Sequence, residues 1–233
     1  MAEKNNQQGA PTAAATHNQS EAFILKYKNA IIGIVAAVVL IILGVTLYRN
    51  YVSGPKEQEA STVLGIGQEL FAEENYEQAL NGDSADYIGF IAISEKYSST
   101  DAGNLAKLYA GLSYANLDQW EEAVKWLEKF TAKSDQMVSP QAIGALGNAY
   151  AHTNQIDKAV ATLTKAAEKA DNYAISPINY VQAAQLLETQ GKNAEALKLY
   201  EKAKTYIDLM PDYQQRATGR LNIEAHIERL SQK

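Results

Sequence analysis

The stretch GLSYANLDQWEEAVKWLEKF, residues 111–130, decides the fold, because its spacing of small and large residues returns twice further along the chain. The recurring positions are Gly111, Tyr114, Ala123, Leu127 and Phe130; Gly147, Tyr150, Ala159, Leu163 and Ala166; and Ala184, Leu187, Ala196, Tyr200 and Ala203. The period is about 36 residues, which is typical of repeats built from a pair of helices. The pattern therefore predicts helical hairpins that stack into a solenoid.

Each copy is expected to form a first helix, a short turn and a second helix. The turns fall at residues 117–119, 153–155 and 190–192. The small residues Ala123, Ala159 and Ala196 are expected where paired helices approach closely. Ser139-Pro140 and Ser176-Pro177 predict helix starts in which a serine hydroxyl caps the helix just before a proline at its first position.

The pattern weakens on both sides of the three copies. Gly67, Leu70 and Ala79 keep the spacing of an earlier copy, but residues 81–84 interrupt it, which predicts an irregular first repeat with an insertion. Near the end of the chain, an apolar stripe predicts a helix that caps the open end of the stack. Its members are Leu221, Ile223, Ile227 and Leu230. We thus expect about four repeats over residues 60–211 and a capping helix within 212–233.

An uncharged apolar segment precedes the repeats, from Ala30 to Tyr48. At about 1.5 Å per residue it reaches roughly 28 Å as a helix, close to the thickness of a bilayer core. Tyrosines stand at both ends, as is typical of membrane interfaces. We expect a disordered tail over residues 1–28, a transmembrane helix over 29–50 and a linker over 51–59. A cleaved signal peptide is the alternative, although its apolar run is normally shorter.

Bulk composition agrees with a helical, non-nucleic-acid-binding protein. Of the 233 residues, 46% are hydrophobic and only five are proline, and 27 acidic residues outnumber 21 basic ones to give a net charge of −6. The negative charge argues against general binding to nucleic acid or anionic lipid. Cysteine is absent, which excludes disulfides and cysteine-based zinc sites. We predict an all-α chain.

On these residues, positions 60 to 210 resemble a tetratricopeptide-repeat (TPR) domain, with three good copies and one irregular copy. The layout of tail, span and repeats also resembles the YfgM-like membrane-anchored TPR proteins. That resemblance implies an ancillary subunit of the bacterial Sec translocon that works with periplasmic chaperones. It further implies a single-pass protein of the bacterial inner membrane, with a cytoplasmic N-terminus and a periplasmic TPR domain. Charges flanking the span are nearly balanced and favour this direction only weakly.

Catalytic chemistry is not indicated. His17, His152 and His226 have no partner at the spacing of metal ligands, and no phosphate-binding or nucleophile motif is present. We therefore predict no enzyme activity, no catalytic or metal-ligating residues, no cofactor and no small-molecule substrate.

TPR stacks bind peptides along the concave face formed by the first helix of each pair, and the resemblance implies such a groove here. By register its candidate residues are Leu105, Leu108, Leu112, Gln141, Asn148, His152, Val181, Gln185 and Glu188. For the three leucines, packing against the preceding repeat is an equal alternative. Asn148 matches the asparagine of carboxylate-clamp TPR domains, but Gly144 stands where their lysine is expected, which argues against clamp-type binding. Trp120 is a further candidate, as an interface anchor, whereas Trp126 is expected in the core.

The sequence thus predicts a membrane-anchored scaffold that recruits a protein partner, such as a component of protein export or a periplasmic chaperone. Two other readings stay open. One is a holdase-type chaperone for emerging clients, and the other is a structural subunit of a larger envelope complex.

Overall fold

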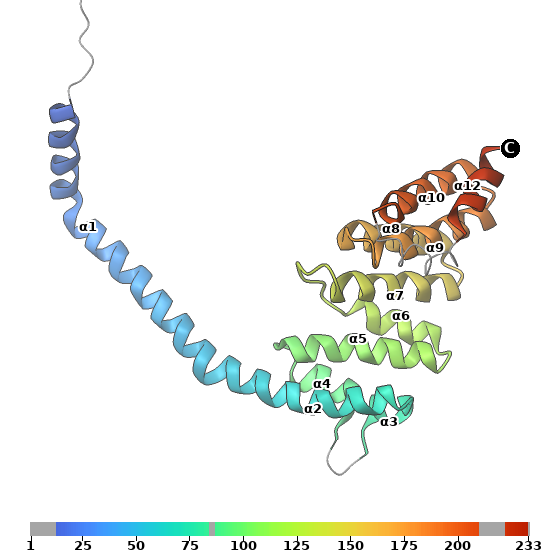
Figure 1. Cartoon of the computed structure of the whole chain (residues 1–233). Helices are drawn as coiled ribbons and strands as arrows, with labels where there is room; N and C mark the ends of the chain where they lie inside the picture. Colours follow the sequence, from blue (N-terminus) through green and yellow to red (C-terminus); the bar gives the residue numbers. More distant parts are fainter. Residues whose placement is uncertain (1–12, 84–86, 210–221, 233) are drawn as a thin grey trace, which may run out of the picture. The chain divides into compact units, whose positions relative to one another are not determined.

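The computed structural model of the chain describes residues 13–83, 87–209 and 222–232, and every element in these parts is helical. This confirms the all-α prediction. The chain divides into two compact units, Met1–Pro55 and Lys56–Lys233. The elements, labelled in Figure 1, are α1 (Ala13–Tyr48), the π-helix η1 (Arg49–Ser53), α2 (Gly54–Ala72), α3 (Tyr76–Asn81), α4 (Gly89–Lys96), α5 (Asp101–Asn116), α6 (Trp120–Glu128), α7 (Val138–His152), α8 (Ile156–Ala170), α9 (Ser176–Thr189), α10 (Asn193–Ile207) and α12 (Ile223–Ser231).

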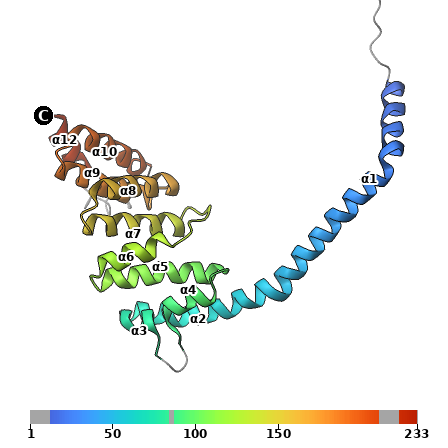
Figure 2. The same cartoon turned by 180° about the vertical axis from the view of Figure 1, so that it is seen from behind.

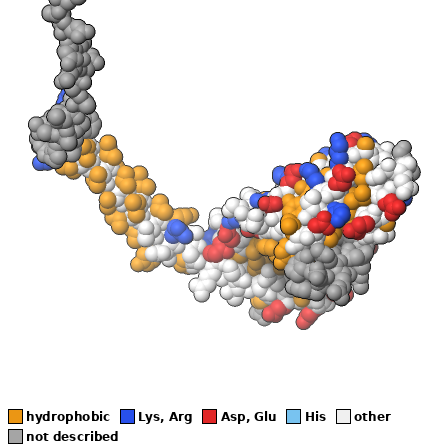
Figure 3. Space-filling view, turned by 45° about the horizontal axis from the view of Figure 1, so that its top comes forward, with side chains coloured by type: hydrophobic (Ala, Val, Ile, Leu, Met, Phe, Trp, Pro, Cys, Tyr) orange, Lys and Arg blue, Asp and Glu red, His pale blue; other side chains and the backbone are white. Residues whose placement is uncertain are grey.

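The first unit is dominated by the apolar helix α1. Its side chains from residue 26 onward are exposed, and Figure 3 shows them as a nearly continuous hydrophobic surface. Within the helical stretch Lys26–Ala72, an 18-residue window has a mean hydropathy of 3.0 and no buried residue. Among the residues that the structure describes, one helix is therefore long and apolar enough to cross a membrane.

The boundaries of α1 differ from the divisions expected at residues 28, 50 and 59. Residues 1–12 lie outside the described chain, but the helix already begins at Ala13, and the expected linker is occupied by η1 and the start of α2. The wider π turn has a local cause. Pro55 has no N–H to donate to the preceding turn, and a Cβ on Gly54 would lie 2.9 Å from the carbonyl oxygen of Arg49.

In the second unit, consecutive helices form antiparallel pairs that stack in chain order. The pairs α5–α6, α7–α8 and α9–α10 lie side by side in both views (Figures 1 and 2). We call the first helix of each pair helix A and the second helix B. They approach closely at the recurring glycines: a Cβ on Gly111 would lie 2.6 Å from Cγ of Leu127, and one on Gly147 2.7 Å from Cγ of Leu163. A side chain at Gly111 or Gly147 would therefore overlap the leucine of helix B, whereas the third copy has Ala184 at the same position.

The same turn joins helix A to helix B in all four copies. One residue per turn has a left-handed backbone: Glu74 (φ 63°), Asp118 (φ 57°), Asn154 (φ 58°) and Gly191 (φ 72°). The next N–H then donates to a carbonyl oxygen five residues earlier: Asn75 to Leu70 (2.9 Å), Gln119 to Tyr114 (2.9 Å), Gln155 to Tyr150 (2.8 Å) and Lys192 to Leu187 (3.0 Å). Because the first copy makes the same turn, it belongs to the repeat.

Helix B of the first copy is split by the insertion expected from the sequence. Its two parts are α3 and α4, and residues 84–86 between them lie outside the described chain. Gly82 and Gly89 both have φ of 84°, and a side chain on either one would meet backbone atoms of the chain segment around the other. Tyr87 fills the gap that the break leaves, and its hydroxyl donates to the carbonyl oxygen of Ala79 at 2.7 Å.

The predicted serine caps are not formed. Helix α7 begins at Val138 and α9 at Ser176, so both serines lie within the first turn and not before it. Ser139 Oγ accepts the N–H of Lys133 at 2.7 Å, and Ser176 Oγ accepts that of Asn172 at 3.1 Å. The hydroxyls thus tie down the loop that precedes each helix A instead of capping the helix.

The last described helix, α12, packs against the end of the stack. Ile223 and Leu230 are buried beside Tyr200 in the same apolar cluster. Leu221, the first residue of the predicted stripe, lies outside the described residues.

Candidate functional site

The residues predicted to line the concave face separate into buried and accessible groups. Leu108 and Val181 are 7% and 2% exposed and pack in the core. Leu112 is half-buried against the same core. Gln141, Gln185 and His152 are exposed, whereas Leu105 and Asn148 are half-buried. Among the predicted residues, Gln141, Gln185 and His152 are therefore the accessible ones, and Leu108 and Val181 belong to the core.

A depression of about 400 Å³ lies between the helices A of neighbouring copies, α7 and α9. It is lined by Met137, Gln141, Gly144, Asn148, Ala174, Ile175, Ile178, Asn179 and Gln182. Two predicted groove residues, Gln141 and Asn148, are thus brought together. Amide side chains both donate and accept hydrogen bonds, which suits the backbone of an extended peptide.

The floor of this depression is formed by Gly144 and Asn179. A Cβ on Gly144 would lie 2.5 Å from Oδ1 of Asn179, so no larger residue fits without displacing that amide. Asn179 is 6% exposed, and its Nδ2 donates to the carbonyl oxygen of Ile175 at 3.0 Å. A side chain at Gly144 would therefore have to displace Asn179, and no Lys or Arg lines the depression.

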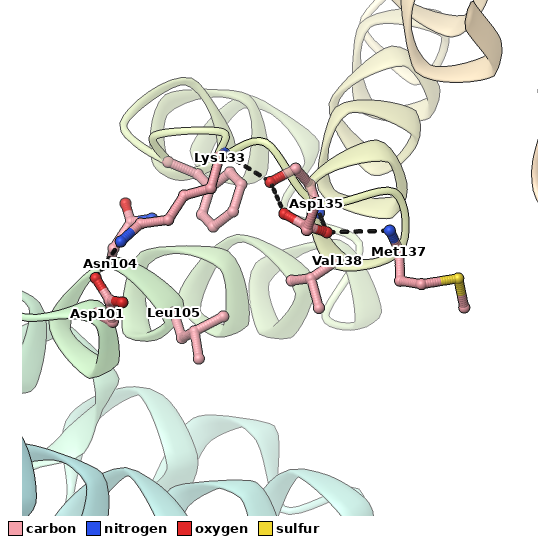
Figure 4. A pocket seen from close by; sticks show the side chains of 9 residues that line it. Asp101, Asn104, Leu105, Lys133, Asp135, Met137 and Val138 are labelled. Carbon is pink, nitrogen blue, oxygen red and sulfur yellow. Dashed lines mark hydrogen bonds and ion pairs between the residues drawn. The ribbon is translucent and has the colours of Figure 1, made fainter. Parts of the chain in front are cut away.

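A second cavity, of about 250 Å³, lies between α5 and the start of α7 (Figure 4). Its lining residues are Asp101, Asn104, Leu105, Phe130, Lys133, Asp135, Met137, Val138 and Ser139. Leu105 was predicted as a groove residue, but the others were missed. The apolar pair Met137-Val138 next to Ser139-Pro140, at a predicted helix start, is the sequence signal that would have indicated them, and the two side chains are 53% and 45% accessible.

Asp135 organises the entry to α7 and supplies a fixed negative charge to the second cavity. Its carboxylate accepts the hydroxyl of Ser139 at 2.5 Å and the N–H groups of Met137 and Ser139 at 3.0 and 2.9 Å. The hydrogen bond from the Ser139 hydroxyl is the main cause that lowers the pKa of Asp135 to about 2, against the opposing effect of burial. Lys133 forms an ion pair with Asp101 across the cavity.

The structure also brings together two candidates that lie far apart in the sequence, Trp120 and His152. Their rings are stacked with centroids 3.6 Å apart and planes inclined by 6°. Trp120 begins α6 and is half-buried, while His152 ends α7 and is exposed. The pair forms a flat aromatic surface at the turn end of two neighbouring repeats, away from both cavities. Trp126 is 8% exposed and lies in the core.

Glu188, the last predicted groove residue, holds the C-terminal helix. It accepts hydrogen bonds from the Tyr200 hydroxyl at 2.7 Å and from Arg229 at 2.5 Å, and lies 3.1 Å from Nδ1 of His226. Burial alone would raise the pKa of Glu188, but these hydrogen bonds outweigh it and hold the pKa below its ordinary value. Within the described parts of the chain, His, Asp and Glu side chains do not gather in threes that suit a metal ion.

Comparisons with known proteins agree with this architecture. Residues 140–170 match the sequence model of the tetratricopeptide repeat. A crystal structure of a Podosopora anserina protein with TPR-like repeats of the kinesin light chain type is similar, with a TM-score of 0.56 and 14% identity over 76% of this chain and 87% of that chain. A point variant of the same protein gives a TM-score of 0.56 and 14% identity, with 86% of its chain covered. No curated protein sequence matches the chain.

At such low identity the structural likeness concerns the fold alone. The matched segment covers most of α7 and all of α8, and the surrounding helix pairs repeat the same turn and the same glycine or alanine crossings. The chain therefore contains a tetratricopeptide repeat at residues 140–170, set within a stack of helical hairpins of the same kind.

Proposed function

We propose that this protein is a membrane-anchored scaffold that recruits a partner protein into the concave face of its TPR domain. The depression between α7 and α9 carries the proposal, because it combines accessible amides with exposed apolar side chains and has no cation to favour a chain terminus. An extended segment of a partner would find hydrogen-bond partners for its backbone there.

The helix α1 supports the membrane part of the proposal. Its exposed apolar surface would be stable in a bilayer and unstable in water. Anchoring would raise the concentration of the TPR domain at the membrane, so that modest affinity for a partner suffices.

The orientation and the machine follow from the resemblance to YfgM-like proteins. We propose a cytoplasmic N-terminus, a periplasmic TPR domain and a partner from the protein-export or periplasmic chaperone machinery. Protease added to intact spheroplasts tests the orientation, because it should cleave within Lys56–Lys233 only if that unit faces outward. Full protection of the unit would reverse the assignment.

Site-specific photocrosslinking in intact cells tests the groove. A photoreactive residue at Gln141 or Gln185, both exposed on helices A, should capture the same protein. The matched control is Lys198, which is exposed on the helix B α10 and lines neither cavity. Equal capture from Lys198, or no defined protein from the groove positions, would contradict the scaffold.

A holdase is the second candidate, and exposed apolar side chains around the two cavities favour it. Met137, Val138 and Ile178 are about half accessible in the free domain. A holdase would slow the aggregation of several unrelated unfolded proteins at stoichiometric ratios. If the domain slows the aggregation of none of these proteins and one defined partner is crosslinked, the holdase is excluded and the scaffold remains.

A further inference from the structure

The second cavity exists because one helix of the stack is short. Helix α6 has 9 residues, whereas the equivalent helices α8 and α10 have 15 each. The final turns that α8 adds carry Ala166, Ala167 and Ala170, which are all fully buried. In the copy containing α6, the same stretch is a loop that begins at Lys129, and the space beside α5 is left open.

A buried amide ends α6 early. Asn104 in α5 donates from Nδ2 to the carbonyl oxygen of Thr131 at 2.8 Å, and its Oδ1 accepts the N–H of Thr131 at 2.8 Å. These bonds use both backbone groups that Thr131 would need to continue a helix. In the two later copies, the position of Asn104 is taken by Pro140 and Pro177, which have no side-chain amide, and helix B runs on.

The open space has the size and lining of a side-chain pocket. Its volume is about 250 Å³, and Leu105, Phe130, Met137 and Val138 give it an apolar wall. Cofactor and drug-sized ligands usually occupy about 300–1,000 Å³, so this cavity fits one or two amino-acid side chains better. Leu105 and Val138 approach it from α5 and α7 (Figure 4), which places it beside the amide-lined depression, with Met137 common to both.

The rim of the cavity is negative on balance. It carries the carboxylates of Asp101 and Asp135 against the single ammonium of Lys133, which is already paired with Asp101. Asp135 is held in place by the Ser139 hydroxyl and by backbone N–H groups, so its charge cannot swing away from the rim. A cationic group beside an apolar anchor would therefore be attracted, and an acidic one repelled.

We propose that this cavity binds a large apolar side chain of an extended partner segment that carries Lys or Arg next to it. The inference rests on the proposed scaffold function and names the chemistry of its partner. The apolar side chain lies between Leu105 and Val138, the adjacent base faces Asp101 and Asp135, and the rest of the segment continues over the amides of Gln141 and Asn148. The short α6 thus creates the pocket that recognises the partner.

Selection from a phage-displayed library of random dodecapeptides tests the proposal, with the full chain held in lipid nanodiscs. The enriched peptides should share an apolar residue next to Lys or Arg. Synthetic copies of these peptides should bind Val138→Asn at least about fivefold more weakly than wild type, because the substitution removes one apolar wall of the cavity. The matched control is Ile88→Asn, because Ile88 is 39% exposed on the same unit and lines neither cavity; it should leave binding unchanged.

The charge is tested separately with Asp101→Asn. Asp101 is exposed, so the variant should fold, and it should weaken binding by about two- to fivefold, with a larger difference at low salt. Peptides that lack the apolar–basic pair, or that bind Val138→Asn as well as wild type, would overturn the inference. If those peptides still compete with the protein captured at Gln141, the scaffold stands and only the pocket assignment falls. Enrichment of no peptide would count against both.

Discussion

At the residue scale, Ser113 is a buried hydroxyl without a partner. It is fully buried in α5, and its Oγ is the one buried side-chain polar atom in the described residues that makes no hydrogen bond. The equivalent position of the next copy is Ala149, which is equally buried. An unpaired buried hydroxyl costs roughly 1–3 kcal/mol, so Ser113→Ala should raise the free energy of unfolding by about 1 kcal/mol. Urea unfolding of both proteins measures this, and a lower midpoint for the variant would contradict it.

Two helical glycines should respond in opposite ways to the same substitution. A Cβ on Gly147 would lie 2.7 Å from Cγ of Leu163, whereas one on Gly65 would meet no atom within 4 Å. Gly147→Ala should therefore destabilise the domain by about 1–3 kcal/mol through overpacking. Gly65→Ala should stabilise it by about 1 kcal/mol through helix propensity. Thermal unfolding of the two variants checks the pair, and shifts of the same sign would show that the A–B crossing is not tight.

At the scale of single elements, the length of α6 depends on Asn104. Asn104→Ala removes both hydrogen bonds to Thr131 and should cost about 1–3 kcal/mol, because the backbone groups of Thr131 then lose their partner. The amide of Thr131 should exchange with deuterium much faster, while that of Ala167 in α8 should not change. Hydrogen-exchange mass spectrometry resolves the two segments. Equal protection of Thr131 in both proteins would show that Asn104 does not determine where α6 ends.

The docking of α12 should depend on pH through Glu188. Its hydrogen bonds to Tyr200 and Arg229 hold its folded-state pKa below the unfolded value of about 4.3. A carboxyl with a lowered pKa contributes stability above the unfolded value and loses it as the pH falls through the folded one. Wild type should therefore exceed Glu188→Gln by about 1 kcal/mol at pH 7, and the difference should shrink as the pH falls to 3. Stability curves at the two values decide this, and a difference that persists in acid would contradict it.

At the scale of the whole molecule, the repeat and its first interruption were predictable, whereas the early end of one helix was not. The positions of Gly111, Gly147 and Ala184 indicated the A–B pairs because solenoid packing repeats the same contact in every copy. The break after Asn81 was visible for the same reason. The early end of α6 was not, since it follows from one tertiary contact between Asn104 and Thr131 that has no period.

The candidate site was predictable only in part. Register placed Gln141 and Asn148 in the depression between α7 and α9. It gave no information on how far each helix A rotates towards its neighbours, which decides that Leu108 and Val181 face the core. The role of Glu188 depends on α12, which lies outside the period of the repeats, and the cavity beside Val138 depends on the missing turns of α6. The non-repeating contacts thus carry the specific chemistry of this chain.

The stacking of His226 on Tyr200, with ring centroids 4.7 Å apart, has a consequence for self-assembly. A solenoid has no inherent length, and the final helix pair presents the same kind of face that receives the next pair inside the stack. Helix α12 occupies that face with Ile223, Leu230 and His226. Helix α12 therefore prevents a further helix pair, from the same or another molecule, from stacking on the end of the solenoid. A protein that ends at Ile207 would expose the apolar face that α12 covers. We expect it to assemble into linear polymers, which light scattering would detect.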